Sequence, residues 1–553
     1  MPGVSRALRE VIAATVAASL LLVLASSASA SPALLNGTRM LTSQQSTVTT
    51  TKLANGEKRL KYEIGPFDII PGQNEIGYQP ITDKPKVDGW ITRMRPDLTY
   101  MNGTVPRVDV AHLHHGVWVN LSRPNSTNSL PELFFAAGEE KTIFQLPKGY
   151  GYRYEASDTW LLNHMIHNLT PTPMKVKMVY EIDFIPDTAP AAKSIKPARP
   201  IWMDVENGKI YPIFNVDKGA GKKNIFTYPN DDPNAYPAGR QRNAWVVDRP
   251  GVLIATAGHL HPGGLHTDLW LERNGAKVRA ANCGRLKQAR AAKKCRVKSP
   301  RGRGDKVHLF ESTAKYFEPA GAVSWDVSMT ATKLGWKVAV KKGDRLNISA
   351  TYDTSNASWY ESMGIMVLWY ADGIKGGAKD PFKSSVDTRG KLTHGHLPEN
   401  DHHGGKARPS LGDARTLANG SFTDNVMIEN FLYGVGDFNL PGKRSRPPLV
   451  RAGQSLTFTN LDATTAISDK NSAYHTITAC KAPCTGTTGI AYPLANAKVQ
   501  FDSGELGFGP AGITPAANRN TWDTPKSLRP GTYTYFCRIH PFMRGAFRVV
   551  KGK

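Results

Sequence analysis

Cysteine is scarce in this chain, with five among 553 residues. Beyond the first 30 residues the sequence also lacks an apolar run long enough to cross a bilayer as a helix, which takes about 20 residues. No apolar period of 3.6 residues is sustained, which argues against a helical protein. Glycine (50) and proline (38) are frequent, and short alternating apolar runs lie between them. The sequence therefore predicts an all-β protein.

Acidic residues are outnumbered by basic ones, 46 against 70, which gives a formal charge of +24. Much of the excess is local, because residues 285–306 hold ten Lys or Arg and one Asp. This segment has no aromatic residue on which a base could stack, so we do not expect nucleic acid as a partner. We interpret it as a solvated basic loop or, alternatively, as a contact for an anionic polymer of the cell envelope or for lipid headgroups.

The first 30 residues have the pattern of a secretory signal peptide. Arg6 and Arg9 precede an apolar stretch over residues 11–25, and an A-x-A cleavage pattern ends at Ala30. We expect cleavage near Ala30 and an extracellular or cell-envelope (periplasm-like) protein with no transmembrane segment in its mature chain. An uncleaved membrane anchor is the alternative.

Changes in composition divide the rest of the chain. We expect a first β-sandwich over residues 31–195, a second over 196–372, a linker rich in Gly and His over 373–420, and a third sandwich over 421–553. The predicted fold class is thus all-β, with two consecutive antiparallel, jelly-roll-like sandwiches followed by another at the C-terminus.

The strongest functional signal lies near the C-terminus. Cys537, His540 and Met543 stand in one tight loop between two runs of β-forming residues. A thiolate, an imidazole and a thioether are soft ligands that favour copper, and a blue-copper site takes two histidines, one cysteine and often a weak axial methionine. His475, in the β-forming stretch 473–478, supplies the second histidine.

The loop spacing Cys-x2-His-x2-Met, with Pro541, Phe542, Arg544 and Gly545 in place, resembles that of amicyanin in the cupredoxin family. The resemblance spans about residues 421–553 and implies a Greek-key β-sandwich that transfers electrons. The ligands that it implies for one type 1 copper are His475, Cys537, His540 and Met543. A buried cysteine with core histidines in an ordinary β-sandwich is the alternative.

The remaining cysteines form two close pairs. Cys283 with Cys295, and Cys480 with Cys484, are candidate disulfides in an oxidising compartment. Metal binding by the second pair is the alternative. Cys537 is left over, which a copper thiolate explains better than an unprotected thiol in an exported protein.

Histidines are concentrated upstream in three short segments. They are His112, His114 and His115; His164 and His167; and His259 and His261. Residues i and i+2 of a strand share a face, so a His-x-His pair on a strand can chelate one ion. Surface histidines are the alternative interpretation.

With the apolar run that follows Met363, these segments resemble the copper type II, ascorbate-dependent monooxygenases, the family of peptidylglycine α-hydroxylating monooxygenase and dopamine β-monooxygenase. They also resemble stress-upregulated Nod19-like proteins. The resemblance covers about residues 60–372 and rests on short motifs. The ligand sets that it implies are His114, His115 and His164 (with His112 or His167 as substitutes) for a first copper, and His259, His261 and Met363 for a second.

Three departures from that family stand in the sequence. Residues 31–200 contain no cysteine, whereas the animal enzymes have disulfides there. No arginine precedes His259 to receive a peptide carboxylate, so a peptidylglycine substrate is not supported. Adjacent strand residues point to opposite faces, so binding through both His114 and His115 needs a bulge or twist; otherwise His112 with His114 is the same-face pair.

Further histidines receive simpler interpretations. His394, His396, His402 and His403 lie in the expected linker, where they bind metal loosely or are incidental. His266 and His308 are expected to be ordinary polar or core histidines.

The resemblances together imply a secreted protein with three coppers. A C-terminal blue-copper domain would feed a two-copper core that hydroxylates a C–H bond with O2, and no side chain would act as a nucleophile. An external redox protein or ascorbate-like reductant would exchange electrons with it. The alternative is a non-enzymatic protein that binds or buffers copper or transfers electrons, with the upstream sandwiches as a scaffold.

Overall fold

The computed structural model describes most of the chain beyond residue 33. The described residues are 34–35, 38–40, 46–70, 74–107, 110–209, 212–236, 239, 241–278, 302–317, 327–355, 358–373, 377–394, 413–463, 473–481, 499–508, 519–540 and 542–552. Several expectations lie outside them: the signal peptide, both disulfide candidates as pairs, most of the basic segment 285–306, and the three linker histidines after His394.

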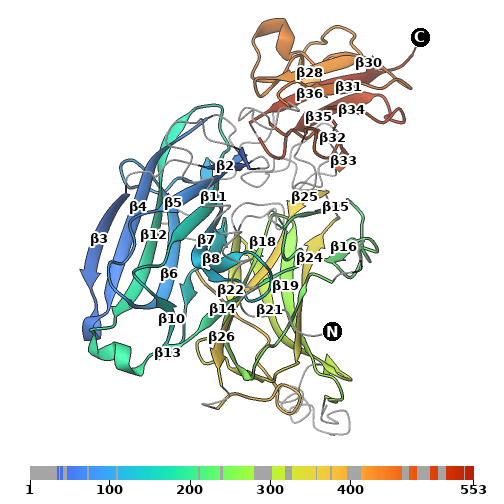
Figure 1. Cartoon of the computed structure of the whole chain (residues 1–553). Helices are drawn as coiled ribbons and strands as arrows, with labels where there is room; N and C mark the ends of the chain where they lie inside the picture. The colour runs from blue at the N-terminus through green and yellow to red at the C-terminus, as the bar shows by residue number, and fades with distance from the viewer. Residues whose placement is uncertain are drawn as a thin grey trace, which may run out of the picture.

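Two facing sheets form the N-terminal sandwich, named here for the strands between residues 34 and 197 (Figure 1). The first sheet has the order β1 (Leu34–Leu35), β2 (Thr38–Met40), β5 (Asn74–Ile81), β11 (Trp160–Asn168), β7 (Ala111–Pro124), β8 (Pro131–Gly138). The second has the order β13 (Lys196–Pro197), β10 (Tyr150–Tyr154), β6 (Gly89–Tyr100), β12 (Met174–Pro186), β4 (Lys58–Ile69), β3 (Ser46–Lys52), with β9 (Phe144–Gln145) paired to β6. Alternation in β12 buries Val176, Met178, Tyr180 and Ile182 between the sheets, as expected of a half-buried strand.

The middle sandwich is built mainly from one large sheet. Its order is β14 (Arg199–Asp204), β26 (Gly364–Asp372), β18 (Gly251–Leu260), β22 (Val327–Ala331), β21 (Lys306–Tyr316), β19 (Gly264–Glu272), β24 (Arg345–Asp353), β16 (Ile225–Tyr228). Four shorter strands of the described residues join this sheet at its sides: β17 (Ala244–Val246), β20 (Gly302–Arg303), β23 (Val338–Val340) and β27 (Lys391–Leu392). A separate two-stranded sheet is formed by β15 (Phe214–Val216) and β25 (Trp359–Ser362). The sheet curls around its own apolar core, in which Leu269 and Met366 are fully buried.

The C-terminal sandwich packs a four-stranded sheet on a five-stranded one. The first has the order β29 (Leu432–Tyr433), β28 (Asn425–Glu429), β31 (Thr457–Asn460), β34 (Thr521–Asp523). The second has the order β30 (Leu449–Arg451), β36 (Arg544–Val550), β35 (Gly531–Phe536), β32 (Thr478–Lys481), β33 (Val499–Asp502). Tyr433, Phe458, Tyr535 and Phe547 fill the space between them.

The all-β prediction is confirmed. The helices of the described residues are single short 3-10 turns: η1 (Ala54–Gly56), η2 (Pro190–Ser194), η5 (Ala414–Thr416) and η6 (Gly442–Ser445). Strand pairing is mostly antiparallel, but β2 with β5, β10 with β13, β28 with β31, and β30 with β36 run parallel. Within the described residues, no helix has the length and apolar character needed to span a bilayer.

Part of the expected linker is packed rather than free. Phe382 is buried in the core of the middle sandwich, and β27 adds to β22. Large apolar residues are few between 373 and 420, which is why composition alone indicated a linker; Phe382, with Val386 packed against the same core, anchors the described residues 377–394.

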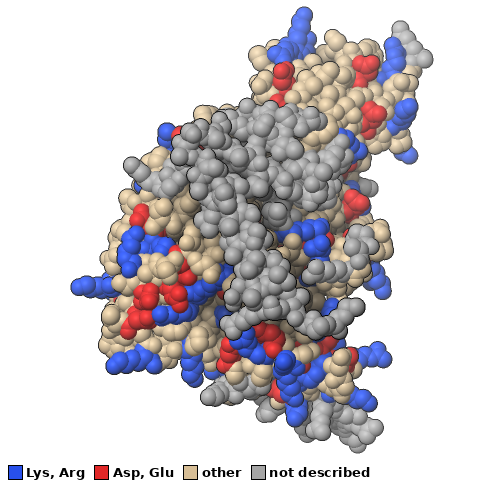
Figure 2. Space-filling model, in the orientation of Figure 1, with Lys and Arg blue, Asp and Glu red and all other residues tan. Residues whose placement is uncertain are grey.

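Charged side chains are spread over the visible face of the molecule. Figure 2 shows Lys and Arg on all three sandwiches with Asp and Glu among them. The described part of the chain therefore carries its positive charge as a mixed surface on this face.

Candidate metal centres

His475, Cys537 and His540 converge at one end of the C-terminal sandwich. The chain leaves β35 at Phe536 and enters β36 at Arg544, and two backbone hydrogen bonds close the loop, from Cys537 N to Met543 O (3.1 Å) and from Met543 N to His540 O (2.9 Å). The Nδ1 atoms of the two histidines are 3.1 Å apart. Cys537 Sγ lies 3.8 Å from Nδ1 of His475 and 3.7 Å from Nδ1 of His540.

The surroundings of these three residues favour a thiolate. Backbone N–H groups of Thr476 and His540 point at Cys537 Sγ over 3.3 and 3.4 Å. Burial by itself would raise the pKa of the Cys537 thiol, but hydrogen bonds and charge from the two imidazoles lower that pKa well below its usual value. A low thiol pKa is what metal ligation by cysteine requires.

Asp462 holds His475 from the far side. Its carboxylate lies 2.9 Å from Nε2 of His475 and accepts the backbone N–H groups of Asn430 (2.7 Å) and Phe431 (3.0 Å). Burial would lower the pKa of His475, but the hydrogen bonds to Asp462 and Cys537 raise it to about 9. A carboxylate on the outer nitrogen fixes which nitrogen faces the centre, as is usual for metal-binding histidines.

The donor set fits copper. Two imidazole nitrogens and one thiolate converge, and Met543 is fully buried in the same core cluster as Cys537. Such a set suits a soft or borderline ion and not a hard one. Sequence reasoning named all four residues but missed Asp462, whose role depends on a contact across 13 positions of chain.

His540 faces the N-terminal sandwich rather than solvent. Its ring is 6.1 Å from the ring of His167 at the end of β11, and it is 1% exposed. The carbonyl of Ile539 also acts on His167, although burial and neighbouring imidazoles lower the pKa of His167 well below its usual value. One histidine of the C-terminal centre therefore contacts the upstream histidines directly.

Arg538 holds the C-terminal sandwich against the middle sandwich. Its guanidinium pairs with Asp502 (3.0 Å), donates to the carbonyl of Ser358 and lies over the ring of Trp359 at 5.4 Å. Ser358 also donates its backbone N–H to Asp502 over 3.2 Å. Ser358 and Trp359 belong to the middle sandwich, so Arg538, the residue next to Cys537, joins the two sandwiches by a hydrogen bond to Ser358 and by its contact with the ring of Trp359.

A β-bulge shapes the first group of upstream histidines. In the pairing of β7 with β11, Leu113 faces Ile166 and His115 faces Met165, which leaves His114 as the extra residue. The bulge that the sequence required for joint use of His114 and His115 is therefore present. Both side chains are buried, with ring centres 5.8 Å apart.

The upstream histidines form one buried cluster across two sandwiches. The distances between ring centres are 5.2 Å for His112 and His167, 6.2 Å for His112 and His114, 6.2 Å for His114 and His167, 4.5 Å for His114 and His261, and 5.1 Å for His259 and His261. His114 thus lies nearer to His261 of the middle sandwich than to the other histidines of β7. Sequence motifs assigned these two residues to separate coppers, whereas the fold places them in contact.

His164 occupies a different place from the other predicted ligands of the first site. It lies edge-on to Phe67, with ring centres 5.1 Å apart, and is close enough to His115 for their charges to interact. Among the described residues, three ligand atoms come within 4.8 Å of one another at the C-terminal centre and at one further group on β19 and β21, and at no triad of this cluster. The grouping of His114, His115 and His164 stays a prediction.

Unsatisfied nitrogens in the cluster indicate an absent partner. Both ring nitrogens of His164 and Nε2 of His259 are buried without a hydrogen bond, which is costly for a polar group. Burial lowers the pKa of His164 to about 3 and that of His115 to about 4, so both imidazoles are neutral at neutral pH. Neutral, buried imidazoles fit a copper ion as their missing partner.

The structure brings the residues of the second predicted site onto neighbouring strands. Leu260 of β18 faces Gly364 of β26, so His261 and Met363 follow at the next position of the ladder. The hydroxyl of Tyr352 accepts the backbone N–H of His261 (3.3 Å) and of Met363 (3.1 Å) and donates to Met363 O (2.6 Å). Tyr352, which sequence reasoning missed, holds the two segments together.

Two buried carboxylates from the N-terminal sandwich complete the cluster. The Glu140 carboxylate accepts from His259 Nδ1 over 3.0 Å and from the backbone N–H of Gly138. Glu139 Oε1 is 3.8 Å from His114 Nε2 and makes no hydrogen bond with either oxygen. Both are 1% exposed. Their signal in the sequence is two adjacent acids directly after an apolar strand, a position where acids are seldom buried.

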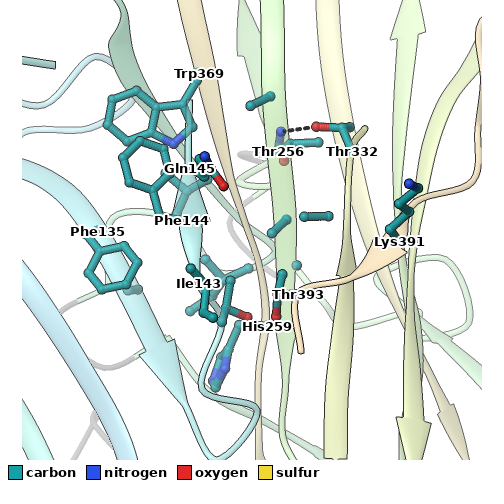
Figure 3. Close-up of a pocket in the computed structure, with 18 of the residues that line it drawn as sticks. Phe135, Ile143, Phe144, Gln145, Thr256, His259, Thr332, Trp369, Lys391 and Thr393 are labelled. Atoms are coloured by element: carbon teal, nitrogen blue, oxygen red, sulfur yellow. Dashed lines mark hydrogen bonds between the residues drawn. The ribbon is translucent and has the colours of Figure 1, made fainter. Parts of the chain in front are cut away.

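A cavity of about 360 Å³ reaches the cluster between the N-terminal and middle sandwiches. Figure 3 shows Phe135, Phe144 and Trp369 on one wall, Thr256 and Thr332 on the other, and His259 at one end. The expected linker also approaches here, because the His394 ring contacts the carbonyl of Glu140.

Comparisons with known proteins give little further assignment. No protein-family model matches the chain, and no curated protein matches it. Among solved structures, a point mutant of amicyanin in its Cu(I) form is 21% identical, covering 26% of this chain and 94% of its own, with a TM-score of 0.13. A copper-containing nitrite reductase (NirK) from Thermus scotoductus SA-01 is 10% identical, covering 93% of this chain and 100% of its own, with a TM-score of 0.16.

Proposed function

We propose that this chain is a multi-copper protein in which a C-terminal blue-copper centre passes electrons to a copper-binding histidine cluster that hydroxylates a C–H bond with O2. The observation that carries the proposal is the burial of His540 against His167. A histidine ligand that is covered by another metal-binding group of the same chain is placed for electron transfer inside the molecule.

The C-terminal residues would hold the first copper. His475, Cys537 and His540 supply the convergent donors and Met543 the thioether. Copper in such a set supplies one-electron transfer, and at the upstream histidines it supplies the reaction with O2. Both centres lie in one chain, and Arg538 contacts Ser358 and Trp359 of the middle sandwich, so the two groups do not need to find each other by diffusion.

The upstream residues would hold two further coppers. One set is drawn from His114, His115 and His164, with His112 and His167 beside them; the other is His259, His261 and Met363. Glu140 orients His259 by binding its outer nitrogen. The contact between the rings of His114 and His261, 4.5 Å apart, supports two sets that lie close together at the interface of the N-terminal and middle sandwiches.

The cavity beside His259 would hold the substrate. Its wall of Phe135, Phe144 and Trp369 favours an apolar or aromatic molecule, and the hydroxyl groups of Thr256 and Thr332 offer polar contacts. In the reaction, a C–H bond becomes C–OH and the second oxygen atom leaves as water, which takes two electrons and two protons from an external reductant.

Copper stoichiometry with an EPR spectrum tests the proposal. About three coppers per chain, one blue and two with ordinary tetragonal signals, are expected. A substrate screen for O2 uptake with apolar compounds that fill the cavity would follow. One blue copper, with none at the upstream histidines after copper loading, would contradict the hydroxylase.

A non-enzymatic copper protein is the second candidate. It is favoured by one observation, the lack of a convergent three-ligand group among the described upstream histidines. Met363→Leu separates the two: the hydroxylase should lose nearly all turnover while retaining its blue copper, and a buffer should lose no more than one copper. Met366→Leu is the matched control, because Met366 lies on β26 three residues after Met363 and is buried in the apolar core of the middle sandwich.

A further inference from the structure

His266 and His308, interpreted from the sequence as ordinary histidines, meet in a second tight group of ligands. β19 and β21 pair so that Asp268 faces Glu311 and Trp270 faces His308. His266 Nδ1 lies 2.8 Å from Asp268 Oδ2, and His308 Nε2 lies 2.8 Å from Asp268 Oδ1. Ligand atoms of His266, Asp268 and Glu311 all lie within 4.8 Å of one another.

The geometry points to a binding site for a divalent ion of the Zn²⁺ type, with His266, Asp268 and Glu311 as ligands and His308 as the residue that orients Asp268. This site is separate from the copper ligands and does not depend on the proposed function.

The chemistry of the ligands selects the class of ion. One imidazole and two carboxylates suit Zn²⁺, which binds His nitrogen and carboxylate oxygen at about 2.0–2.2 Å with tetrahedral geometry. Ca²⁺ and Mg²⁺ take oxygen ligands alone, and the set has no sulfur to favour Cu(I). The side chain of His266 is 31% exposed, so an ion and water can reach the group from solvent.

A second observation is the state of His308. Its side chain is 10% exposed, and its Nε2 pairs with Asp268 Oδ1 over 2.8 Å. The ring is held in place by Trp270, with ring centres 4.5 Å apart. A carboxylate that binds a metal ion is usually held by a hydrogen bond from a neighbouring residue. His308 is in position to hold Asp268 in this way.

The position of the site suggests what the ion does. Side chains alternate along a strand, so Thr267 and Ser312, next to Asp268 and Glu311, point to the opposite face of the sheet. There they pack on Gly258, whose backbone N–H binds Ser312 Oγ over 3.0 Å. A bound ion would hold β19 and β21 together, as a clamp, on the face of the sheet opposite to Gly258, the residue that precedes His259.

The clamp also joins strands that are distant in sequence. β19 ends at Glu272 and β21 begins at Lys306. A link across a long connection restricts the unfolded chain more than a local one does, so the ion should raise the unfolding temperature.

Zn²⁺ titration of the full-length chain as purified, with copper measured before and after, tests the site. We expect one Zn²⁺ per chain in addition to the copper present, an affinity weakened at least about 100-fold in Asp268→Asn, and one weakened about 10- to 100-fold in His308→Asn. Glu272→Gln is the matched control, because Glu272 is a carboxylate of the same strand paired with Lys306 and outside the group. It should bind Zn²⁺ as the unaltered chain does.

Two outcomes would overturn the inference. The first is equal Zn²⁺ stoichiometry and affinity in the unaltered chain and in Asp268→Asn. The second is Zn²⁺ that binds only as copper is released, which would place it in a copper site. Unfolding temperatures without Zn²⁺ show whether each variant folds, and a Zn²⁺-induced rise in the unaltered chain that Asp268→Asn lacks would support the clamp.

Discussion

The two proposed copper regions are built in different ways. At the C-terminal centre, three of the four ligands come from one seven-residue loop, and their atoms converge without a metal ion. In the upstream cluster the histidines come from three strands and two sandwiches, and their rings are 4.5–6.2 Å apart. A short loop positions its own ligands, whereas ligands on separate strands depend on the packing of whole sheets.

The difference extends to the charge of the imidazoles. His475 pairs with Asp462 and the Cys537 thiolate, which raise its pKa to about 9 after burial alone would lower it. His164 has no such partner, and burial lowers its pKa to about 3. In the first region His475 is paired with Asp462, whereas in the second both ring nitrogens of His164 are buried without a hydrogen bond.

The largest expected effect comes from Cys537→Ser. A serine hydroxyl is not ionised at neutral pH and is a hard ligand, so the blue colour and the associated EPR signal should disappear completely. Copper at the upstream cluster should remain, because none of its residues is changed. Loss of all copper together in a folded variant would show that the two regions do not bind independently.

Arg538→Leu should weaken the contact between the C-terminal and middle sandwiches. It leaves Asp502 buried without its ion pair, which costs roughly 3–5 kcal/mol of unfolding free energy. Transfer of an electron from the reduced blue copper to the upstream cluster, followed by rapid kinetics, should slow at least about tenfold. Arg451→Leu, an exposed arginine of the same sandwich, is the control. An unchanged transfer rate in Arg538→Leu would argue against docking as the route.

Glu140→Gln tests whether the N-terminal sandwich positions a ligand of the middle one. Removing the carboxylate from His259 Nδ1 should weaken copper binding at the second upstream site about 10- to 100-fold, measured by competition with a chelator. Glu132→Gln changes a buried glutamate of β8, the strand that precedes Glu140, which instead accepts from Tyr152, and it should leave copper affinity unchanged. Equal affinities in the two variants would remove Glu140 from the site.

His164→Leu should stabilise the metal-free chain and at the same time lower its copper binding. Because both ring nitrogens of His164 are buried without hydrogen bonds, the metal-free variant should be more stable by about 1–3 kcal/mol. Its copper content should fall. His475→Leu is the contrasting change: it leaves Asp462 without its partner and should destabilise the metal-free chain. A loss of stability in His164→Leu would mean that this imidazole is satisfied without a metal ion.

The smallest effect is on the pH dependence of the metal-free chain. The pKa values of His115 and His164 are depressed on folding, so their contribution to stability is complete above about pH 6.5 and is lost as the pH falls toward 4 and 3. The C-terminal pair behaves differently. Between about pH 6.5 and 8.5, His475 and Cys537 together bind one proton in the folded and in the unfolded chain, so their contribution should be flat.

Urea unfolding of the metal-free chain between pH 4.5 and 8.5 checks this. Because the buried carboxyls of Glu139 and Asp204 have raised pKa values and act in the opposite direction, the informative quantity is the difference between the two chains: between pH 4.5 and 6.5, stability should increase less with pH in His164→Leu than in the unaltered chain. A slope that is the same in both chains would show that His164 titrates normally.

Much of the fold was accessible from the sequence. Alternating apolar residues, frequent Gly and Pro, and the lack of helical periodicity led to the all-β class, because these patterns depend on local backbone geometry. The packing of residues 377–394 was missed, since few apolar residues, chiefly Phe382, anchor a segment whose composition is that of a linker.

The four residues of the C-terminal centre were readable from the sequence for the same reason: a seven-residue loop between two strands carries three of them at a spacing that a turn brings together. The upstream cluster was readable only as candidate ligands. Only the tertiary structure decided that His114 meets His261, that Glu140 supports His259, that His540 faces His167, and that His266 and His308 share Asp268. The first three contacts join different sandwiches and are set by the packing of whole sheets against one another, while the last depends on the register of β19 with β21 in one sheet; neither leaves a local signal in the sequence.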